Sequence, residues 1–275
     1  MNSKACNLCN STTNLIFSSL ILNKYEVKYY RCSSCELIHT EPVYWIEEAY
    51  SSSIALTDTG IILRNEVNKQ RIIIALTLLN NLSFTFSKFK PYNFNVLDYG
   101  AGYGILVRML RDIGINAYWY DKYTQNLFAR GFEHNEDIRI NCLLAFELFE
   151  HLEYPLEELT KLINSFKPDT IIFSTLLYEG SCPNKDWWYY SFETGQHISF
   201  YNQTTLNKLA EILDYNYYSI LPDFHVFSKT PFDTLKIQKY FKNIEGHFVK
   251  FSNLYYSKTF NDHLLMKELL KNKFN

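Results

Sequence analysis

The sequence predicts an α/β fold, in which short apolar strands alternate with amphipathic helices. The clearest evidence is the stretch Asn95–Leu110, where a β-prone run ends in a glycine-rich turn and passes into helical spacing. Farther along, the apolar runs Cys142–Glu147 and Thr170–Thr175 are typical of buried parallel strands, and an amphipathic helix is expected over 156–166 between them. Paired cysteines near the N-terminus predict an additional small unit.

Composition narrows the class of protein. The chain has 275 residues, of which 47% are hydrophobic, enough for one domain with additions or for two small domains. A formal net charge of -2 gives no basic footprint, so a nucleic-acid partner is not favoured. The N-terminus lacks the apolar region of a secretory signal, and no apolar run approaches the roughly 18 residues that span a bilayer. We therefore expect a cytoplasmic protein.

The N-terminal region carries two C-x-x-C motifs. Cys6 and Cys9 form the first and Cys32 and Cys35 the second, and the alternating runs between them predict short strands. Four thiolates from two such motifs suit a tetrahedral, structural Zn²⁺ ion, so we expect a zinc ribbon over 1–45. A region this small cannot bury enough apolar surface to fold alone, and metal binding would supply its folding free energy. Two disulfides or a redox-active pair are the alternatives, which a reducing cytosol and the lack of a βαβ pattern disfavour.

Helical segments are expected on either side of the α/β core. Residues 46–90 form a predicted helical connector, in which Asp58 or Thr59 caps a long helix. Residues 91–230 make up the predicted α/β domain, and 231–275 form a Lys-rich, aromatic extension with helical spacing. The sequence assigns neither a role to this extension nor an oligomeric state to the chain.

The turn after the first strand of the core contains an acid and three alternating glycines. The acid is Asp98, and the glycines are Gly100, Gly102 and Gly104. Glycine accepts a positive φ and, without a Cβ, lets a ligand approach the backbone. In a dinucleotide fingerprint the third glycine comes one residue later, and the lysine of a Walker loop is absent. A glycine-rich turn in some other doubly wound domain is the alternative.

A second acid ends the next predicted strand. The run Ile115–Asp121 places Asp121 about twenty residues beyond the glycines, at the tip of a neighbouring strand. There a carboxylate can accept hydrogen bonds from two ribose hydroxyls. An ordinary helix N-cap is the alternative. The following segment, 125–141, is short for a full crossover, so the third strand is expected to be abbreviated.

The pattern Asp98-x-Gly100-x-Gly102-x-Gly104 resembles the first motif of class I S-adenosylmethionine (SAM)-dependent methyltransferases. The resemblance implies a Rossmann-like methyltransferase sheet of seven strands. It also implies that the acid orders the loop and that the glycines lie along the methionine part of SAM. With the N-terminal cysteines, the chain resembles bacterial zinc-knuckle methyltransferases, among which are enzymes that modify sugars.

The stretch Ala145–Pro155 strengthens this resemblance, because many members of the family carry a similar acid-rich segment that ends in Glu-His-Leu. The resemblance implies that Phe146 and Glu147 lie beside the cofactor. It also implies that Glu150 and His151 border the active site. A structural histidine at a helix start is the alternative for His151.

An aromatic stretch follows the strand Thr170–Thr175. Four adjacent aromatic residues, Trp187–Tyr190, lead to His197. Loops at the carboxyl ends of strands bind ligands in open α/β sheets, and aromatic faces suit a ring-shaped substrate such as a sugar. A lid that packs on the domain is the alternative. His197 is the first candidate for a general base because histidine titrates near neutrality, and His151 and Tyr189 follow it.

Together these features predict a SAM-dependent methyltransferase with a structural Zn²⁺ ion. The expected acceptor is a small molecule, namely a nucleotide-linked or surface-polysaccharide sugar. One alternative is an RNA or protein methyltransferase that recognises its partner through the zinc ribbon, although the ribbon has no basic stretch. Another is a non-catalytic SAM-binding module, against which the intact motif residues Asp98 and Asp121 stand. The sequence does not determine whether oxygen, nitrogen or carbon receives the methyl group.

Overall fold

A computed structural model describes residues 4–50, 60–81 and 94–232 and the single positions 235, 238 and 265. The chain divides into two compact units. One unit consists of Met1–Thr57 with Ala145–Pro231, and the other of Asp58–Leu144 with Phe232–Asn275. We call them the first and the second unit.

The strands of the α/β region form a six-stranded sheet in the order β5-β4-β6-β7-β10-β9. They are β4 (Asn95–Tyr99), β5 (Asn116–Tyr120), β6 (Cys142–Ala145), β7 (Thr170–Ser174), β9 (Asn216–Leu221) and β10 (Phe224–Ser228). Strand β4 pairs in parallel with β5 and β6, whereas β10 pairs antiparallel with β7 and β9. The predicted α/β class is therefore confirmed, with an antiparallel end to a sheet that begins parallel.

The described residues form six strands in this sheet, one fewer than the seven implied by the family resemblance. The segment between β5 and β6 contributes only an isolated bridge between Trp119 and Glu133. The Glu133 carboxylate accepts hydrogen bonds from Asn126 Nδ2 at 2.7 Å and from Gly131 N at 2.9 Å, which folds the segment into a compact loop. The third strand is thus abbreviated to a single bridge, because its segment is too short for a helix and a strand.

Both units contain helices. They are α1 (Ile46–Ala49), α4 (Pro155–Phe166), α5 (Gln203–Ile212) and the 3-10 turns η3 (Phe149–His151) and η4 (Trp188–Tyr190) in the first unit, and α2 (Ile61–Asn81) and α3 (Ile105–Asp112) in the second. Pro155 opens α4, where the missing N–H of proline costs no helical hydrogen bond. Asn202 caps α5, and its Oδ1 accepts a hydrogen bond from Thr205 N at 2.9 Å.

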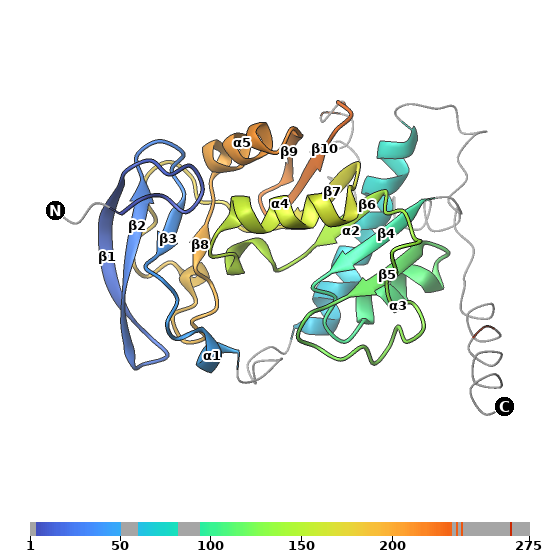
Figure 1. Ribbon diagram of the computed structural model, residues 1–275, viewed down its shortest axis with the longest axis horizontal. Helices are drawn as coiled ribbons and strands as arrows, with labels where there is room; N and C mark the ends of the chain where they lie inside the picture. The colour runs from blue at the N-terminus through green and yellow to red at the C-terminus, as the bar shows by residue number, and fades with distance from the viewer. Residues whose placement is uncertain are drawn as a thin grey trace. The chain divides into compact units, whose positions relative to one another are not determined.

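The first unit also contains a four-stranded sheet made of β1 (Thr13–Ile21), β2 (Tyr25–Cys32), β3 (Ile38–Thr40) and β8 (Ser199–Phe200). Figure 1 shows β8 beside β3, although the two strands lie far apart in the sequence. Their pairing places Ile38 opposite Phe200 and His39 opposite Ser199. Buried side chains from β1, β2 and β3 pack with Phe200 and Tyr190 in one hydrophobic cluster. The N-terminal strands therefore share a core with the segment that directly follows His197.

Some predictions lie outside the described residues. These are the helix caps Asp58 and Thr59 and, except for a few positions, the extension 231–275. The domain boundaries proposed from the sequence stay a prediction. Among the described helices, none combines the length and the apolar character needed to cross a membrane.

Candidate active site

The glycine-rich turn joins β4 to α3 in the second unit. All three glycines have a positive φ, which is 78° at Gly100, 52° at Gly102 and 85° at Gly104. This left-handed backbone explains why the turn is built from residues without a Cβ. The N–H groups of Gly100 and Ala101 donate to Tyr120 O at 2.9 and 3.2 Å, which fastens the turn to the end of β5.

Gly104 and Gly102 differ in what an added side chain would meet. A Cβ at Gly104 would lie 2.8 Å from Asn126 Oδ1 and 3.1 Å from Ala129 Cβ. A Cβ at Gly102 would meet no described atom within 4 Å. The turn is therefore closed behind Gly104, the N-cap of α3, and open at Gly102, where a ligand can approach the backbone.

Asp121 follows β5 and contacts the same turn. Its Oδ2 accepts a hydrogen bond from Gly102 N at 2.9 Å. Its Oδ1 accepts hydrogen bonds from Tyr123 N at 2.8 Å and from Thr124 N at 2.7 Å. A carboxylate offers about four acceptor directions, so Oδ2 keeps one that could accept a ribose hydroxyl. Asp121 thus caps the following loop and orients the glycine turn at the same time.

Asp98 is the buried acid of the motif, with only 4% of its surface exposed. Burial is the main cause that raises the pKa of Asp98 to about 7, and the negative charge of Asp121 adds to it. Both effects disfavour the ionised form of the carboxyl group. Asp98 is therefore close to its titration point under neutral conditions.

Asp98→Asn is expected to stabilise the cofactor-free protein at pH 8 much more than at pH 5. The pKa of Asp98 in the folded protein, about 7, lies above its ordinary value of 3.8, so the contribution of Asp98 to folding stability is fully present below pH 3.8. It is lost as the pH rises through about 7, and the complete loss is on the order of 4 kcal/mol. Urea unfolding of both proteins between pH 5 and pH 8 measures the effect.

Asp137→Asn serves as the control for this experiment, because Asp137 is an exposed carboxylate of the same unit. We expect its unfolding free energy to follow that of the native protein across the pH range. Parallel curves for the native protein and Asp98→Asn would contradict the assignment of a raised pKa to Asp98.

Phe146 and Glu147 follow β6 in the first unit. The Phe146 ring is buried and stacks on Phe224, with 6.1 Å between ring centroids. Glu147 is exposed and has a φ of 50°. Its N–H donates to Ser174 Oγ at 2.8 Å, and the Ser174 hydroxyl donates to Glu147 Oε1 at 3.0 Å. The last residue of β7 therefore orients a carboxylate that remains accessible to a ligand.

Glu150, His151 and His197 come together in the first unit. One ligand atom from each lies within 4.8 Å of the others, and the two imidazole rings meet edge to face with centroids 5.1 Å apart. Glu150 is 0% exposed, and neither of its carboxylate oxygens has a hydrogen-bond partner among the described residues. Burial raises the pKa of Glu150, although the charge of His197 opposes this shift. Burial and then the charge of His197 lower the pKa of His151 to about 4.

Backbone carbonyls orient both imidazoles. Nδ1 of His151 lies 2.9 Å from Gln196 O, and Nδ1 of His197 lies 2.7 Å from Tyr189 O. A carbonyl oxygen only accepts hydrogen bonds, so each Nδ1 must carry the hydrogen. In the neutral rings, each Nε2 therefore keeps a lone pair that can bind a proton or a metal ion.

The segment that carries His197 is tied to the turn that carries Glu150. Ile198 N donates to Glu150 O at 2.8 Å. Ser199 Oγ donates to Leu152 O at 2.6 Å, and both groups are buried. These contacts set the distance between the two segments, and they explain how residues far apart in the sequence form one cluster.

The N-terminal region holds the same segment from the other side. Trp45 Nε1 donates to Gly195 O, and Gln196 Nε2 donates to Ala49 O, both at 2.8 Å. Gly195 has a φ of 65°, and a Cβ there would lie 2.6 Å from Ile21 Cγ2. The backbone before His197 therefore packs tightly on β1 and α1, and their integrity determines where the imidazole lies.

The aromatic stretch Trp187–Tyr190 mostly faces the interior of the unit. Tyr189 is 5% exposed and Tyr190 is 0% exposed, whereas Trp188 is 73% exposed. The Tyr190 ring contacts Tyr29 of β2 edge to face at 5.6 Å. The alternative of a lid that packs on its own domain therefore describes the buried Tyr189 and Tyr190 and also Trp187, which is half-buried against the same hydrophobic cluster.

Tyr189 lies against His197, with ring centroids 4.7 Å apart. Its hydroxyl accepts a hydrogen bond from Leu176 N at 3.1 Å and lies 3.3 Å from Thr175 Oγ1. Burial raises the pKa of Tyr189 well above its usual range, and the charge of Glu150 adds to this. These contacts orient Tyr189, and its backbone carbonyl in turn orients His197.

A cavity of about 330 Å³ lies beside this stretch, after the end of β7. Aromatic and polar side chains line it together, among them Tyr178, Glu179, Cys182, Asn184 and Trp187. Its volume falls at the lower end of the range found for small-molecule sites. This part of the first unit can therefore receive a compact ligand.

The four N-terminal cysteines converge as the motif spacing predicts. The Sγ atoms of Cys6 and Cys35 lie 3.6 Å apart and those of Cys9 and Cys32 lie 3.5 Å apart, and all four lie within 4.8 Å. These distances exclude disulfides, whose S–S bond is about 2.05 Å. In a tetrahedral site with Zn–S bonds of about 2.3 Å, the sulfur atoms lie about 3.8 Å apart. The thiol arrangement therefore fits a zinc ion.

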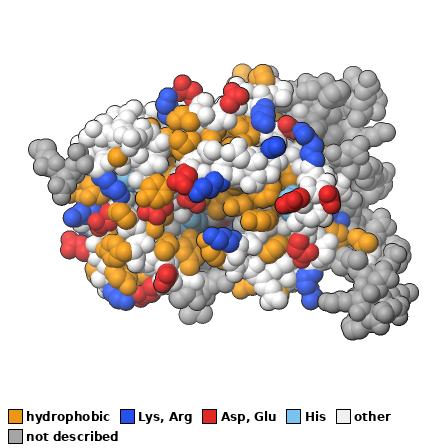
Figure 2. Space-filling view, in the orientation of Figure 1, with side chains coloured by type: hydrophobic (Ala, Val, Ile, Leu, Met, Phe, Trp, Pro, Cys, Tyr) orange, Lys and Arg blue, Asp and Glu red, His pale blue; other side chains and the backbone are white. Residues whose placement is uncertain are grey.

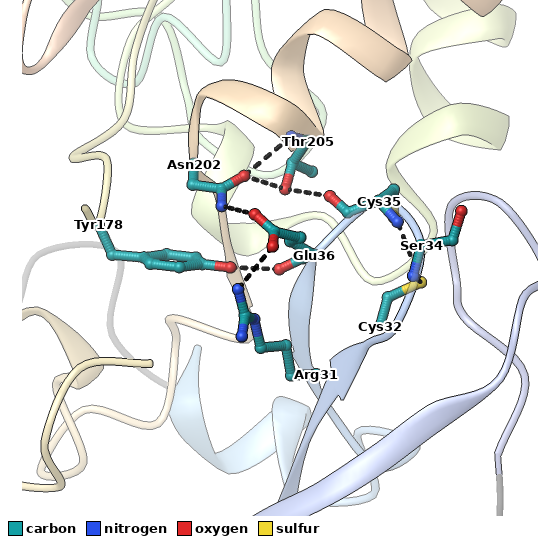
Figure 3. A network of polar contacts seen from close by, with 8 residues as sticks. All are labelled: Arg31, Cys32, Ser34, Cys35, Glu36, Tyr178, Asn202 and Thr205. Atoms are coloured by element: carbon teal, nitrogen blue, oxygen red, sulfur yellow. Dashed lines mark hydrogen bonds and ion pairs between the residues drawn. The ribbon is translucent and has the colours of Figure 1, made fainter. Parts of the chain in front are cut away.

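The second cysteine motif is anchored to the C-terminal part of the first unit (Figure 3). Thr205 Oγ1, at the start of α5, donates to Cys35 O at 2.8 Å. The neighbouring Glu36 accepts from Asn202 Nδ2 through its carboxylate and from the Tyr178 hydroxyl through its carbonyl. The cysteine site is thus continuous with α5 and with the wall of the cavity.

Sequence reasoning placed Glu150 only at the border of the site. The structure shows that this carboxylate is fully buried and lies within 4.8 Å of a ring nitrogen of each of the two histidines. Trp45 and Ser199 position the His197 segment, and the sequence alone gives no indication of this role. Neither residue belongs to a motif, and no local pattern could have found them, because their partners lie far away in the sequence.

Comparison with protein families gives one match. The model of a protein family described as a methyltransferase domain matches residues 68–220, which is more than half of the chain. A comparison with curated proteins finds no match.

Among solved structures, the plantazolicin methyltransferase BpumL in complex with SAH is 15% identical, with a TM-score of 0.44, over 74% of this chain and 88% of BpumL. Human N-acetylserotonin methyltransferase in complex with SAM is 15% identical, with a TM-score of 0.38, over 68% of this chain and 66% of that one. The small RNA methyltransferase HEN1 is 15% identical, with a TM-score of 0.38, over 60% of this chain and only 26% of HEN1. Because the family match covers most of the α/β core, the chain belongs to the methyltransferase-domain family and is a SAM-dependent methyltransferase.

Proposed function

We propose that this methyltransferase acts on a small hydroxylated acceptor, a nucleotide-linked or surface-polysaccharide sugar. The cavity beside Trp187 carries the proposal, since it combines aromatic faces with the side chains of Glu179 and Asn184. Aromatic faces pack against sugar rings, and carboxylate and amide groups bond sugar hydroxyls. On the face shown in Figure 2, basic and acidic side chains are interspersed, which does not favour a nucleic-acid backbone there.

The cofactor site is proposed to consist of the residues that the family resemblance implies. They are Asp98, Gly100, Gly102, Gly104, Asp121, Phe146 and Glu147. The open backbone at Gly102 and the orientation of Asp121 support this assignment. When bound, SAM supplies a methyl group activated by its sulfonium charge, and the protein supplies alignment and electrostatics.

The acceptor is proposed to lose its proton at the cluster of Glu150, His151 and His197. His197 is the first candidate for the base, because its Nε2 carries a free lone pair and its ring is fixed by Tyr189 O. His151 is the second candidate. Tyr189 is assigned a positioning role, since its hydroxyl is already engaged inside the unit.

The four cysteines are proposed to bind a structural Zn²⁺ ion. Their number and spacing fit a closed tetrahedral site without an open position. Cys32 and Cys35 flank the turn between β2 and β3, and β3 pairs with the strand that follows His197. Zinc would therefore support the position of the candidate base from a distance.

Transfer of a labelled methyl group from SAM tests the proposed acceptor. The full chain is incubated with separate pools of nucleotide sugars, RNA and protein, and His197→Ala provides the background. We expect label in a nucleotide sugar. Label confined to RNA or protein would overturn the proposal in favour of the partner-recognition alternative. Calorimetric SAM binding without transfer to any pool would indicate a non-catalytic module.

A further inference from the structure

The proposed function does not explain why the carboxylate of Glu150 is completely buried. It is 0% exposed, and neither of its oxygens makes a hydrogen bond of normal geometry to a described residue, although the hydroxyls of Tyr189 and Thr175 lie near enough to favour its charged form. An isolated buried carboxylate is costly, and it needs a proton, a paired cation or a metal ion. Two imidazoles lie beside it, with one ligand atom of each within 4.8 Å of the carboxylate.

The two imidazoles are arranged as metal-bound histidines usually are. In metalloproteins, a ligating histidine donates its other ring N–H to a carbonyl or carboxylate, which fixes its tautomer and orientation. His151 and His197 each do this through Nδ1, to Gln196 O and Tyr189 O. Each ring is therefore restrained from behind and keeps Nε2 available for a ligand.

We propose that Glu150, His151 and His197 bind one divalent transition-metal cation, as a site of two histidines and one carboxylate. Imidazole and carboxylate together suit first-row cations such as Mn²⁺, Fe²⁺, Co²⁺ and Zn²⁺. Ligands of one cation at about 2.1 Å lie about 3–4 Å apart, and the three ligand atoms already lie within 4.8 Å of one another, so small side-chain rotations complete the site. The cation neutralises the buried carboxylate, whose oxygens make no hydrogen bond of normal geometry to a described residue.

Three protein ligands leave open coordination positions on the cation. An acceptor hydroxyl bound at one of them loses its proton to solvent more readily, because the cation stabilises the oxyanion. His197 is then a metal ligand, and the cation replaces it in activating the acceptor. This catalytic role rests on the proposed function, whereas binding of the cation does not.

Manganese binding to the full chain, with zinc already on the cysteines, tests the site. Mn²⁺ prefers oxygen and nitrogen ligands, so it does not displace zinc from four thiolates. Loss of the free Mn²⁺ signal in electron paramagnetic resonance measures binding. We expect one Mn²⁺ per chain in the native protein and in the control His134→Asn, whose histidine lies in the second unit.

Glu150→Gln and His197→Gln are each expected to weaken Mn²⁺ binding by at least about 100-fold. Glu150→Gln keeps the volume of the side chain and removes its charge, and we expect its thermal midpoint without manganese to equal or exceed that of the native protein. His197→Gln provides the second variant if Glu150→Gln does not fold.

The site is overturned if the native protein binds no Mn²⁺ at millimolar concentration, which would mean that a proton or the neighbouring charge of His197 compensates Glu150. It is also overturned if both variants bind as tightly as the native protein. Manganese binding that the variants lose, without methyl transfer to any acceptor pool, supports the metal site and rejects the proposed function. Methyl transfer to a sugar without manganese binding supports the proposed function and rejects the metal site.

Discussion

Cys35→Ser is expected to abolish zinc binding and to unfold the N-terminal four-stranded sheet. Structural zinc contributes about 10–16 kcal/mol in small cysteine sites, which is comparable to the whole stability of a domain. The effect should extend beyond the sheet, because Cys35 O accepts the hydroxyl hydrogen of Thr205 and β3 pairs with β8. Metal analysis gives the zinc content, and circular dichroism gives the thermal midpoint.

Cys182→Ser is the matched control for this variant. Cys182 is a free, half-buried thiol of the same unit that lies outside the four-cysteine cluster. We expect it to retain one zinc per chain and a thermal midpoint close to that of the native protein. A Cys35→Ser protein that keeps stoichiometric zinc, or that loses zinc without any change in its thermal midpoint, would contradict the structural role.

His197→Ala is expected to lower turnover at least about 100-fold while SAM affinity stays within about twofold. The imidazole belongs to the Glu150 cluster, whereas the glycine turn and Asp121 belong to the other unit of the chain. Loss of the ring removes a base or a metal ligand and leaves the glycine turn intact. Labelled methyl transfer measures turnover, and calorimetry measures SAM binding.

His134→Ala controls for the loss of a histidine elsewhere and should leave turnover unchanged. Two results would count against the role of His197. One is full turnover in His197→Ala, and the other is a loss of SAM affinity that accounts for the lower rate. Comparison with Mn²⁺ binding then separates the two chemical roles, because a histidine that acts only as a base can be removed without loss of the cation.

The cysteine cluster and His197 belong to the same unit of the chain. The N-terminal strands pair with β8, and Trp45 and Gln196 connect α1 to the backbone next to His197. We therefore expect the four-cysteine site, with zinc bound, to position the candidate active site in addition to stabilising its own strands. A zinc-free protein is expected to lose turnover even where its glycine turn remains folded.

Local patterns in the sequence were enough to predict the parts whose geometry depends on neighbouring residues. The positive φ values at Gly100, Gly102 and Gly104 are such a case, because a tight turn between strand and helix requires them. The convergence of the cysteines is another, because each C-x-x-C motif already places two thiols on one side of a turn. The short segment 125–141 likewise predicts the abbreviated third strand, because its length alone limits what it can form.

Only the tertiary structure decided what surrounds each of these parts. The sequence predicts that the aromatic stretch faces the substrate, yet Tyr190 packs against Tyr29, which lies far away in the sequence. The family resemblance implies that Glu150 borders the active site, and folding buries it completely beside His197. Burial and long-range pairing depend on contacts between residues that are distant in sequence. The sequence by itself therefore determined the fold class, the glycine-rich motif and the cysteine cluster, and the tertiary structure decided which side chains surround Glu150 and how deeply it is buried.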